Sequence, residues 1–339
     1  MKPIRSSRHW TRVTRRCSAS PGGWRRSAKP ESPARHNRPG GHAPDPGTTG
    51  HKAIGVSRME QGEISLSDRE FSRVKNRVYS VAGISLSDAK RTLVISRLSK
   101  IVRALGLPGF DAYLDYLERQ GTAQDGQDFV NALTTNLTRF YREDHHFEHL
   151  RSHVGALMAE RPRGSRLRIW SAGCSTGQEP YTVGMDLLAA FPDLKRWDFK
   201  VLATDIDTAV IAKAARGIYS ENELNGLAGE RARPFEKLGD GTIRVPQAVR
   251  ELISFKPLNL IGPWPMKGPF DAIFCRNVAI YFDKPTQGEM FGRFSKLLAP
   301  EAFLYIGHSE NLGSGGEGFR LVGKTIYQSR QKLSKREAA

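Results

Sequence analysis

The sequence predicts an α/β protein with a doubly wound sheet in its C-terminal part and an all-helical unit before it. Two observations support this prediction. Between residues 136 and 339, short apolar strand patterns alternate with helical patterns, as in mostly parallel sheets that are covered by helices. Between residues 60 and 135, apolar residues recur at helical spacing between capping residues and glycines.

The composition is that of a globular chain in a reducing compartment. Hydrophobic residues make up 39% of the 339 positions, and no apolar stretch approaches the roughly 18 residues needed to cross a membrane. The three cysteines, Cys17, Cys174 and Cys275, form no CxxC pair and no disulfide framework. We therefore expect a cytoplasmic protein without direct membrane insertion.

The net charge of +17 is concentrated in the N-terminal segment. Residues 1–58 hold 13 Lys/Arg and two Asp/Glu, a net +11, and the remaining residues have a net +6. The segment is rich in Pro, Gly, Ser and Arg, so we expect it to be disordered. It can be a transit peptide, although it lacks an amphipathic stripe, or a basic arm for nucleic acid or anionic lipid. We favour a third interpretation, a start-site artefact with translation beginning at Met59.

Four helices are predicted between residues 60 and 135. Ser67 and Glu70 form a capping-box pattern before the first helix, and Gly83 is placed to end it. Ser87 can cap a second helix. A third follows Pro108-Gly109 and ends at Gly121, and a fourth runs from about Gln127 into Leu133.

The second of these helices is amphipathic and basic. Its apolar residues fall within one arc of roughly 120°, namely Val94, Ile95, Leu98, Ile101, Val102 and Leu105. Lys90, Arg97, Lys100 and Arg103 occupy the opposite side without interleaved carboxylates, and only Arg91 falls among the apolar positions. The cationic side can be a solvated surface or a docking face for an acidic partner. The residues alone leave both interpretations open.

Strands and helices alternate in the C-terminal part. Strands are predicted at "LRIWSA", "FKVLATDID", "FDAIFCRN" and "AFLYIG", with helices between them, and "FRLVGKTIYQSR" can form an edge strand. A segment at about residues 218–258 breaks the alternation. Because its "LGDGTIRV" is typical of a hairpin, we expect a small inserted β-subdomain there.

The first strand-end loop indicates the kind of ligand. In open α/β sheets, ligands bind at the carboxyl ends of the strands, near the point where the strand order reverses. The loop from Gly173 to Glu179 matches neither a Walker A nor a GxGxxG pattern. Glu179 would repel a phosphate at this helix N-terminus. S-adenosylmethionine, with a sulfonium, an ammonium and no phosphate, therefore fits better than a dinucleotide.

Three further strand-end loops carry polar residues. Asp205 ends a strand where a carboxylate can accept hydrogen bonds from two ribose hydroxyls, while Asp207 is the better N-cap for the next helix. The remaining loops contribute Asn259-Leu260, which can flank an adenine, and Arg276-Asn277.

Six segments of the chain resemble the CheR-type chemotaxis receptor methyltransferases in order and spacing. They are "LTTNLTRFYREDHHF", "WSAGCSTGQEPYT", "ATDID", "NL", "FDAIFCRNVAIYFD" and "YIGHSENL", and the resemblance covers about residues 62 to 330. It implies an S-adenosylmethionine-dependent protein-glutamate O-methyltransferase that releases S-adenosylhomocysteine. It also implies a helical N-terminal domain over 60–135 and a Rossmann-like methyltransferase domain over 136–339 with the small β-subdomain.

The resemblance also implies a set of cofactor-binding residues. These are Asn136, Thr138, Arg142, Glu179, Asp205, Asn259, Leu260, Arg276 and Asn277. The family usually has two glutamates where this chain has Gln178-Glu179, so the assignment requires the second glutamate to be the binding one. The β-subdomain is short around "KLGDG", which argues against the grip on a receptor's C-terminal peptide that some members have.

The implied partner gives the basic helix a role. Methylation sites of chemoreceptors are glutamates on long acidic helical hairpins, so the resemblance favours docking of the receptor's cytoplasmic helical domain on Lys90, Arg97, Lys100 and Arg103. A glutamate with a pKa of about 4.3 is ionised at neutral pH and needs no general base for an in-line displacement. Arg142 and Tyr281 are candidates for positioning it, although Tyr281 can also be a core residue.

Other chemistries are less favoured. His145, His149 and His153 can share one helix face, but no carboxylate or cysteine clearly completes a set, so we expect no metal. Cys174 and Cys275 fit small buried residues beside a ligand better than redox groups. A nucleic-acid or small-molecule methyltransferase and a non-catalytic cofactor reader are the rival functions. The modest charge of residues 59–339 argues against nucleic acid, the retained Arg142 and Asp205 argue against the reader, and we expect a monomer.

Overall fold

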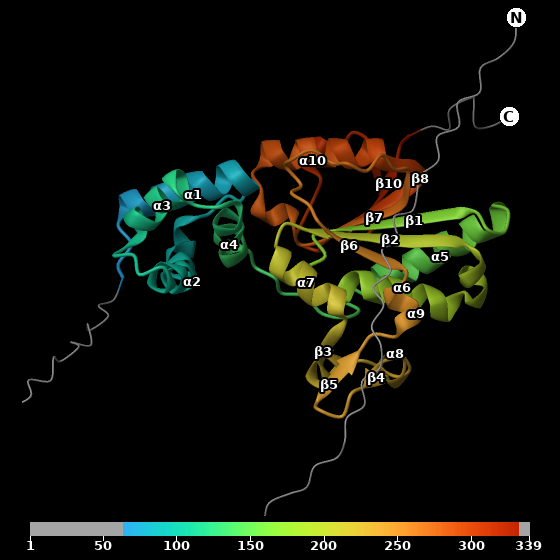
Figure 1. Cartoon of the computed structure of the whole chain (residues 1–339). Helices are drawn as coiled ribbons and strands as arrows, with labels where there is room; N and C mark the ends of the chain where they lie inside the picture. Colours follow the sequence, from blue (N-terminus) through green and yellow to red (C-terminus); the bar gives the residue numbers. More distant parts are fainter. Residues whose placement is uncertain (1–63, 332–339) are drawn as a thin grey trace, which may run out of the picture. The chain divides into compact units, whose positions relative to one another are not determined.

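The computed structural model describes residues 64–331, and Figure 1 shows their elements in chain order. The interpretations of residues 1–58 and of Cys17 lie outside the described residues. In the described part, helices α1 to α4 precede a large sheet and the helices that cover it. The predicted α/β class with a preceding helical unit is confirmed.

The first helix begins and ends as its sequence predicts. Helix α1 spans Asp68–Ala82. The Ser67 hydroxyl accepts a hydrogen bond from the Glu70 N–H at 3.3 Å, and the Glu70 carboxylate accepts one from the Ser67 N–H at 2.8 Å. Gly83 ends the helix with a φ of 69°, a left-handed conformation that glycine adopts without strain.

Helix α3 begins directly after Gly109 as predicted, whereas α2 and α4 differ from the prediction at their starts. Helix α2 spans Arg91–Ala104 and follows a 3₁₀ turn at Asp88–Lys90, and the Ser87 side chain makes no capping bond there. Helix α3 spans Phe110–Arg119, and α4 spans Ala123–Leu133 rather than starting near Gln127. A second capping box, between Thr122 and Asp125, starts α4. The first turns of α4 are polar, so apolar periodicity alone could not locate this start.

The large sheet has seven strands in the order β6-β2-β1-β7-β8-β10-β9. The first five run parallel, and β10 pairs antiparallel with both β8 and β9. Their bounds are β1 Arg166–Ala172, β2 Asp198–Asp205, β6 Ile253–Pro257, β7 Phe270–Cys275, β8 Leu298–Ile306, β9 Phe319–Gly323 and β10 Ile326–Ser329. The chain passes from β1 outward to β2 and β6 and then returns to β7, so the strand order reverses between β1 and β7.

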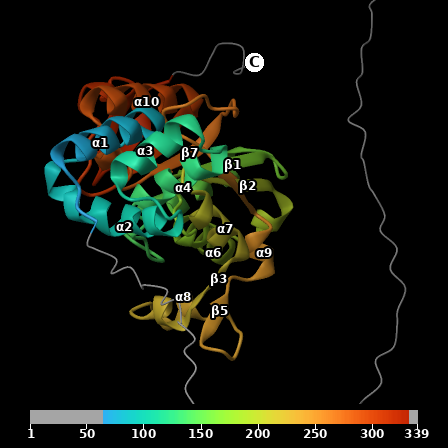
Figure 2. The same ribbon diagram turned by 60° about the vertical axis from the view of Figure 1, so that its left-hand side comes forward.

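Helices cover both faces of the sheet, as Figures 1 and 2 show. Helices α5 (His145–Glu160) and α6 (Gln178–Ala190) pack on one face, where Phe147 and Leu150 join Ile169 and Phe274 in one apolar cluster. Helix α10 (Lys284–Leu297) packs on the other face around Trp170. Helix α7 (Thr208–Arg216) follows β2.

Two predicted β segments need correction. The segment predicted as one edge strand, "FRLVGKTIYQSR", forms the hairpin β9-β10. The predicted β unit at 218–258 extends too far, because residues 253–257 form β6 in the large sheet. As an edge strand, β6 has only one buried residue, Ile253, and so lacks the apolar run of a central strand.

The small sheet consists of β3 (Ile218–Ser220), β5 (Thr242–Arg244) and β4 (Glu236–Lys237) in that order. Short helices α8 (Gly229–Ala232) and α9 (Gln247–Arg250) lie in the same stretch of chain. The Tyr219 hydroxyl donates to the Thr176 carbonyl at 2.6 Å, and the ring of Phe140 lies 5.1 Å from that of Tyr219. The small sheet is therefore joined to the loop after β1 and to the connector that follows α4.

Candidate active site

A cavity of about 310 Å³ lies at the carboxyl ends of the parallel strands. It lies at the reversal of strand order between β1 and β7, where open α/β sheets bind ligands, and its volume is in the usual range for small-molecule sites. The structure brings all of the predicted cofactor residues, and Tyr281, to its wall: Asn136, Thr138, Arg142, Glu179, Asp205, Asn259, Leu260, Arg276 and Asn277.

The helical unit supplies one wall of this cavity. Ala82, Ile84 and Leu133 line it together with residues 134–139 and Arg142 of the connector between α4 and α5 (residues 134–144). The Asn259 amide donates to the Val81 carbonyl at 2.7 Å, and the Ser85 N–H donates to the Tyr281 carbonyl at 2.8 Å. The cavity is thus shared between the helical unit and the loops that follow the strands.

Asp207 ties the connector to the sheet. One of its carboxylate oxygens caps α7 by accepting from the N–H groups of Ala209 and Val210, which confirms the predicted cap. The other oxygen accepts from the Thr134 hydroxyl at 2.7 Å and from the Asn136 amide at 2.8 Å. Asn136 therefore lines the cavity from a fixed position.

Asp205 is buried at the end of β2, and both of its oxygens accept backbone hydrogen bonds. The Ser175 N–H donates to one at 2.8 Å, and the Asp207 N–H donates to the other at 3.0 Å. Burial raises the pKa of Asp205 to about 6. In the loop before Ser175, Gly173 has a φ of 85°, and a Cβ there would lie 2.2 Å from Val278. Only glycine at position 173 allows the loop after β1 to approach the loop after β7, which carries Val278, so closely.

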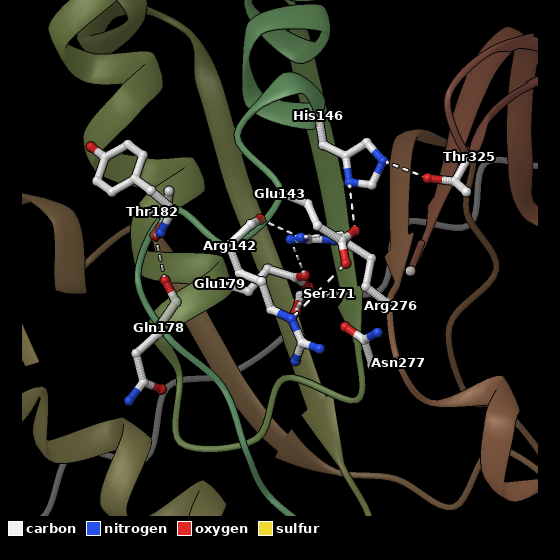
Figure 3. A network of polar contacts seen from close by, with 12 residues as sticks. Arg142, Glu143, His146, Ser171, Gln178, Glu179, Thr182, Arg276, Asn277 and Thr325 are labelled. Carbon is white, nitrogen blue, oxygen red and sulfur yellow. Dashed lines mark hydrogen bonds and ion pairs between the residues drawn. The ribbon is translucent and has the colours of Figure 1, made fainter. Parts of the chain in front are cut away.

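Arg276 lies between two carboxylates, as Figure 3 shows. Its side chain is 2% exposed. One terminal nitrogen donates to Glu179 at 3.0 Å, and the other lies 3.3 Å from Glu143 and donates to the Arg142 carbonyl. The second carboxylate oxygen of Glu179 accepts from the Ser171 hydroxyl at 2.7 Å. One buried guanidinium thus joins the loop after β7 to the start of α6 and to the connector.

The pKa values of Glu179 and Glu143 shift in opposite directions. Burial raises the pKa of Glu179, and Arg276 opposes that rise only in part. Burial acts in the same direction on Glu143, but Arg276 and His308 together hold its pKa below the ordinary value. His308 Nδ1 lies 2.8 Å from Glu143. Burial lowers the pKa of His146, another neighbour of Glu143, to about 3, so the His146 ring is neutral.

Glu310 organises the two neighbouring loops. Its buried carboxylate accepts from the N–H groups of Asn277 at 2.8 Å, Val278 at 3.0 Å and Ile280 at 3.3 Å, and from Gly307. It therefore holds the loop after β7 against the loop after β8. The amide Oδ1 of Asn277 is buried without a hydrogen-bond partner in the cavity wall. A buried orphan acceptor of this kind suits a ligand donor.

Glu143 and Glu310, which support the loops of the cavity, are not among the residues predicted from the sequence. Both lie inside segments that carry the family resemblance, "RFYREDHHF" and "YIGHSENL". Glu143 directly follows the predicted Arg142, and Glu310 lies three residues after a strand-end glycine. The available signal was a carboxylate beside a predicted site residue or in a strand-end loop, but partners such as backbone N–H groups leave no trace in the sequence.

The two predicted positioning residues lie in the cavity wall. Arg142 donates to the Leu137 carbonyl at 3.1 Å. Tyr281 belongs to a 3₁₀ turn at Ala279–Tyr281, and its hydroxyl donates to the Thr135 carbonyl at 3.3 Å. Burial raises the pKa of Tyr281, so its hydroxyl stays protonated at neutral pH. Its place in the cavity wall does not match the alternative of a plain core residue.

The three spaced histidines of α5 bond to different parts of the chain. His145 contacts the Lys324 carbonyl, His149 the Tyr305 hydroxyl and His153 the Asp271 carbonyl, each at 3.0 Å. Cys174 and Cys275 are both buried, and burial raises the pKa of each thiol. Both cysteines therefore stay protonated, as expected of small packing residues.

The basic side of α2 divides into two kinds of residue. Lys90, Lys100 and Arg103 are exposed. Arg97 is half-buried and donates to the carbonyls of Ala132 and Thr134 at the end of α4. Arg97 thus supports the helical unit itself, in contrast to the free docking cation that the sequence predicts.

No helix among residues 64–331 is long and apolar enough to cross a membrane.

The chain matches known proteins over most of its length. Residues 136–328 match the family described as CheR methyltransferase, SAM binding domain, and residues 69–134 match CheR methyltransferase, all-alpha domain. A probable chemotaxis protein methyltransferase of Rhizobium etli is 45% identical over 267 residues, 77% of this chain and 100% of the relative. The chemotaxis protein methyltransferase of Escherichia coli is 44% identical over 272 residues, 78% of this chain and 92% of the relative.

A third relative, chemotaxis protein methyltransferase 2 of Pseudomonas aeruginosa, is 42% identical over 270 residues, 78% of this chain and 94% of the relative. These matches confirm the resemblance that the six sequence segments indicated.

The substitution Arg276→Met tests whether the buried guanidinium balances the negative charges of Glu143 and Glu179. Without it, the largely buried Glu143 and Glu179 lose their shared cation and keep only His308 and the Ser171 hydroxyl, so we expect the free energy of unfolding near pH 7 to fall by about 3 kcal/mol. Their folded-state pKa values would then lie above the unfolded ones. The folded variant would take up protons as the pH falls, and much of the deficit should disappear by about pH 5. Urea unfolding at both pH values measures this.

Two further variants make the test specific. Arg276→Met combined with Glu179→Gln removes one unpaired charge and should be more stable than Arg276→Met alone. Arg163→Met removes an arginine that is 75% exposed and should change stability by no more than about 0.5 kcal/mol. A deficit in Arg276→Met that is equal at both pH values would contradict the charge explanation.

Proposed function

The chain belongs to the CheR methyltransferase family, and we propose that it transfers a methyl group from S-adenosylmethionine to glutamate side chains of chemotaxis receptors. The observation that carries the proposal is the cavity at the reversal of strand order, which contains the strand-end residues of the matched SAM-binding domain. The products would be a glutamate methyl ester and S-adenosylhomocysteine. The proposed setting is receptor adaptation, with the cytoplasmic helical domain of the receptor as partner and a monomeric cytoplasmic enzyme.

The residues in the cavity fit this cofactor. The buried carboxylates of Glu179 and Asp205 favour a cationic ligand over a phosphate. Each Asp205 oxygen accepts one backbone bond and has capacity for one more, from a ribose hydroxyl. The orphan Oδ1 of Asn277 can accept a further donor. Asn259 and Leu260 lie in the same wall, where they can flank the adenine.

The chain has to supply position and shelter rather than a base. S-adenosylmethionine supplies an electrophilic methyl group, and the acceptor carboxylate is already ionised at neutral pH. Arg142 lies in the cavity wall with a guanidinium that can hold a carboxylate through charge-assisted hydrogen bonds. The Tyr281 hydroxyl can donate a second bond to the acceptor if it leaves the Thr135 carbonyl, to which it donates at 3.3 Å. Holding the acceptor in line in this way can provide much of the rate enhancement.

A labelling experiment tests the proposed reaction. The full chain is incubated with methyl-labelled S-adenosylmethionine and a chemoreceptor cytoplasmic fragment, and the product is then treated with mild alkali. We expect volatile, base-released label, because a carboxyl methyl ester hydrolyses readily. Base-stable label would place the methyl group on nitrogen or carbon instead. Binding of the cofactor without any labelling would favour the non-catalytic reader.

Reversing two cations tests whether the basic side of α2 docks the receptor. Lys100→Glu with Arg103→Glu should raise the KM for the receptor fragment at least tenfold at low salt, because both side chains are exposed and face an acidic partner. Affinity for S-adenosylhomocysteine, measured by calorimetry, should not change. The matched control is Lys195→Glu with Arg196→Glu, the same charge change before β2, at the amino ends of the parallel strands and so away from the cavity. Equal KM values in the two double variants would refute docking at α2.

The raised pKa of Asp205 predicts a pH dependence of cofactor binding. The carboxylate form accepts the ribose hydroxyls, and it is lost as the pH falls through about 6. Affinity for S-adenosylhomocysteine should therefore weaken below pH 6, by at most about tenfold per pH unit because one proton is linked. Calorimetry from about pH 7.5 to about pH 5.5 measures this. Asp205→Asn should bind more weakly and with a flatter profile, and an unchanged slope would assign the titration to another group.

A further inference from the structure

We propose that Leu137 and Ile280 form an apolar rim at the mouth of the cavity that contacts the acceptor helix on both sides of its target glutamate. This inference rests on the proposed function, because it concerns how the acceptor of that reaction is held at the same cavity. The partner it fits is an acidic amphipathic helix. Such a helix would carry small or apolar residues one turn away from the glutamate that enters the cavity.

Both rim residues are unusually exposed for their type. Leu137 is 83% exposed, the highest value among the exposed large hydrophobic residues in the described part of the chain. Ile280 is 50% exposed. Single exposed apolar residues are common on protein surfaces. These two come from segments far apart in sequence and both line one cavity, which is the arrangement of an interaction site.

The backbone of each rim residue is held in place. The Ile280 N–H donates to the buried Glu310 carboxylate at 3.3 Å. The Leu137 carbonyl accepts from Arg142 at 3.1 Å, and the preceding Asn136 is bonded to Asp207. The two apolar side chains are therefore presented on anchored segments, so little ordering is needed when a partner covers them.

The geometry of the acceptor explains why a rim is needed. A glutamate on a helix can reach into the cavity only if its own helix lies across the mouth. Residues three and four positions away on that helix share its face, so they meet whatever surrounds the mouth. At this mouth they would meet Leu137 and Ile280.

The charges around the mouth agree with an acidic partner. Arg139 lines the cavity and is exposed. Arg97 of α2 is bonded to the carbonyl of Thr134, another residue of the cavity wall, so the basic side of α2 begins beside the mouth. An acidic helix lying over the rim would place its outer carboxylates toward Arg139 and the exposed Lys100 and Arg103 of α2, while its apolar residues cover the rim.

The test replaces each rim residue by serine. Leu137→Ser and Ile280→Ser should each lower kcat/KM for a chemoreceptor cytoplasmic fragment about tenfold, through KM, because each loses the burial of one large apolar side chain. Affinity for S-adenosylhomocysteine should fall less than kcat/KM does, although both residues also line the cofactor cavity. Leu321→Ser is the matched control, since Leu321 is 59% exposed on β9 and does not line the cavity. Unchanged kcat/KM in both rim variants would overturn the proposal.

A lysine variant separates apolar contact from charge. Leu137→Lys should be about as impaired as Leu137→Ser if the rim covers apolar residues of the partner. If Leu137→Lys matches or exceeds the unsubstituted protein, the contact is electrostatic and the apolar rim is refuted.

Direct binding separates this proposal from the proposed reaction. Calorimetry in the presence of S-adenosylhomocysteine measures affinity for the receptor fragment without any methyl transfer. A fragment that binds, and binds more weakly to Leu137→Ser, supports the rim even if the unsubstituted protein labels nothing, and in that case only the reaction fails. A fragment that binds both proteins equally overturns the rim even if it is methylated. A fragment that the unsubstituted protein neither binds nor labels overturns both.

Discussion

The buried guanidinium of Arg276 is the interaction on which the rest of the site depends. It contacts Glu179 at the start of α6 and Glu143 in the connector, and it donates to the Arg142 carbonyl. Through Glu143 the contact extends to His308 in the loop after β8. Three strand-end segments and the connector thus meet at one cation. Since a buried unpaired charge is costly, none of these segments can move away alone.

Three further carboxylates hold the remaining loops of the site in place. Asp205 accepts the N–H of Ser175 and so joins the ends of β1 and β2. Asp207 caps α7 and holds the connector, and Glu310 gathers the N–H groups of the β7 and β8 loops. In each case an anion satisfies groups that come from different segments. Of these carboxylates Asp205 also lines the cavity, beside Glu179, so it both joins two loops and favours a cationic ligand.

The sequence was sufficient wherever the signal was local or periodic. The capping box at Ser67, the alternation of strands and helices and the strand-end position of Asp205 are all of this kind. Prediction from the sequence failed where the hydrogen-bond partner of a residue is distant in the chain. The partners of Arg97 are carbonyls at the end of α4, and those of Glu310 are backbone N–H groups, so neither role has a sequence pattern. Strand β6 was missed because an edge strand with one buried residue lacks an apolar run.

Because the helical unit forms one wall of the cavity, it constrains how related chains can diverge. Ala82, Ile84 and Leu133 are fitted to loops after β2, β6 and β7 by hydrogen bonds that cross between the two parts, such as the one from Asn259 to the Val81 carbonyl. A helical unit transplanted from a relative would bring its own version of this wall. Receptor preference and cofactor affinity are therefore inherited together, and a change of partner through the helical unit alone would also alter the shape of the catalytic cavity.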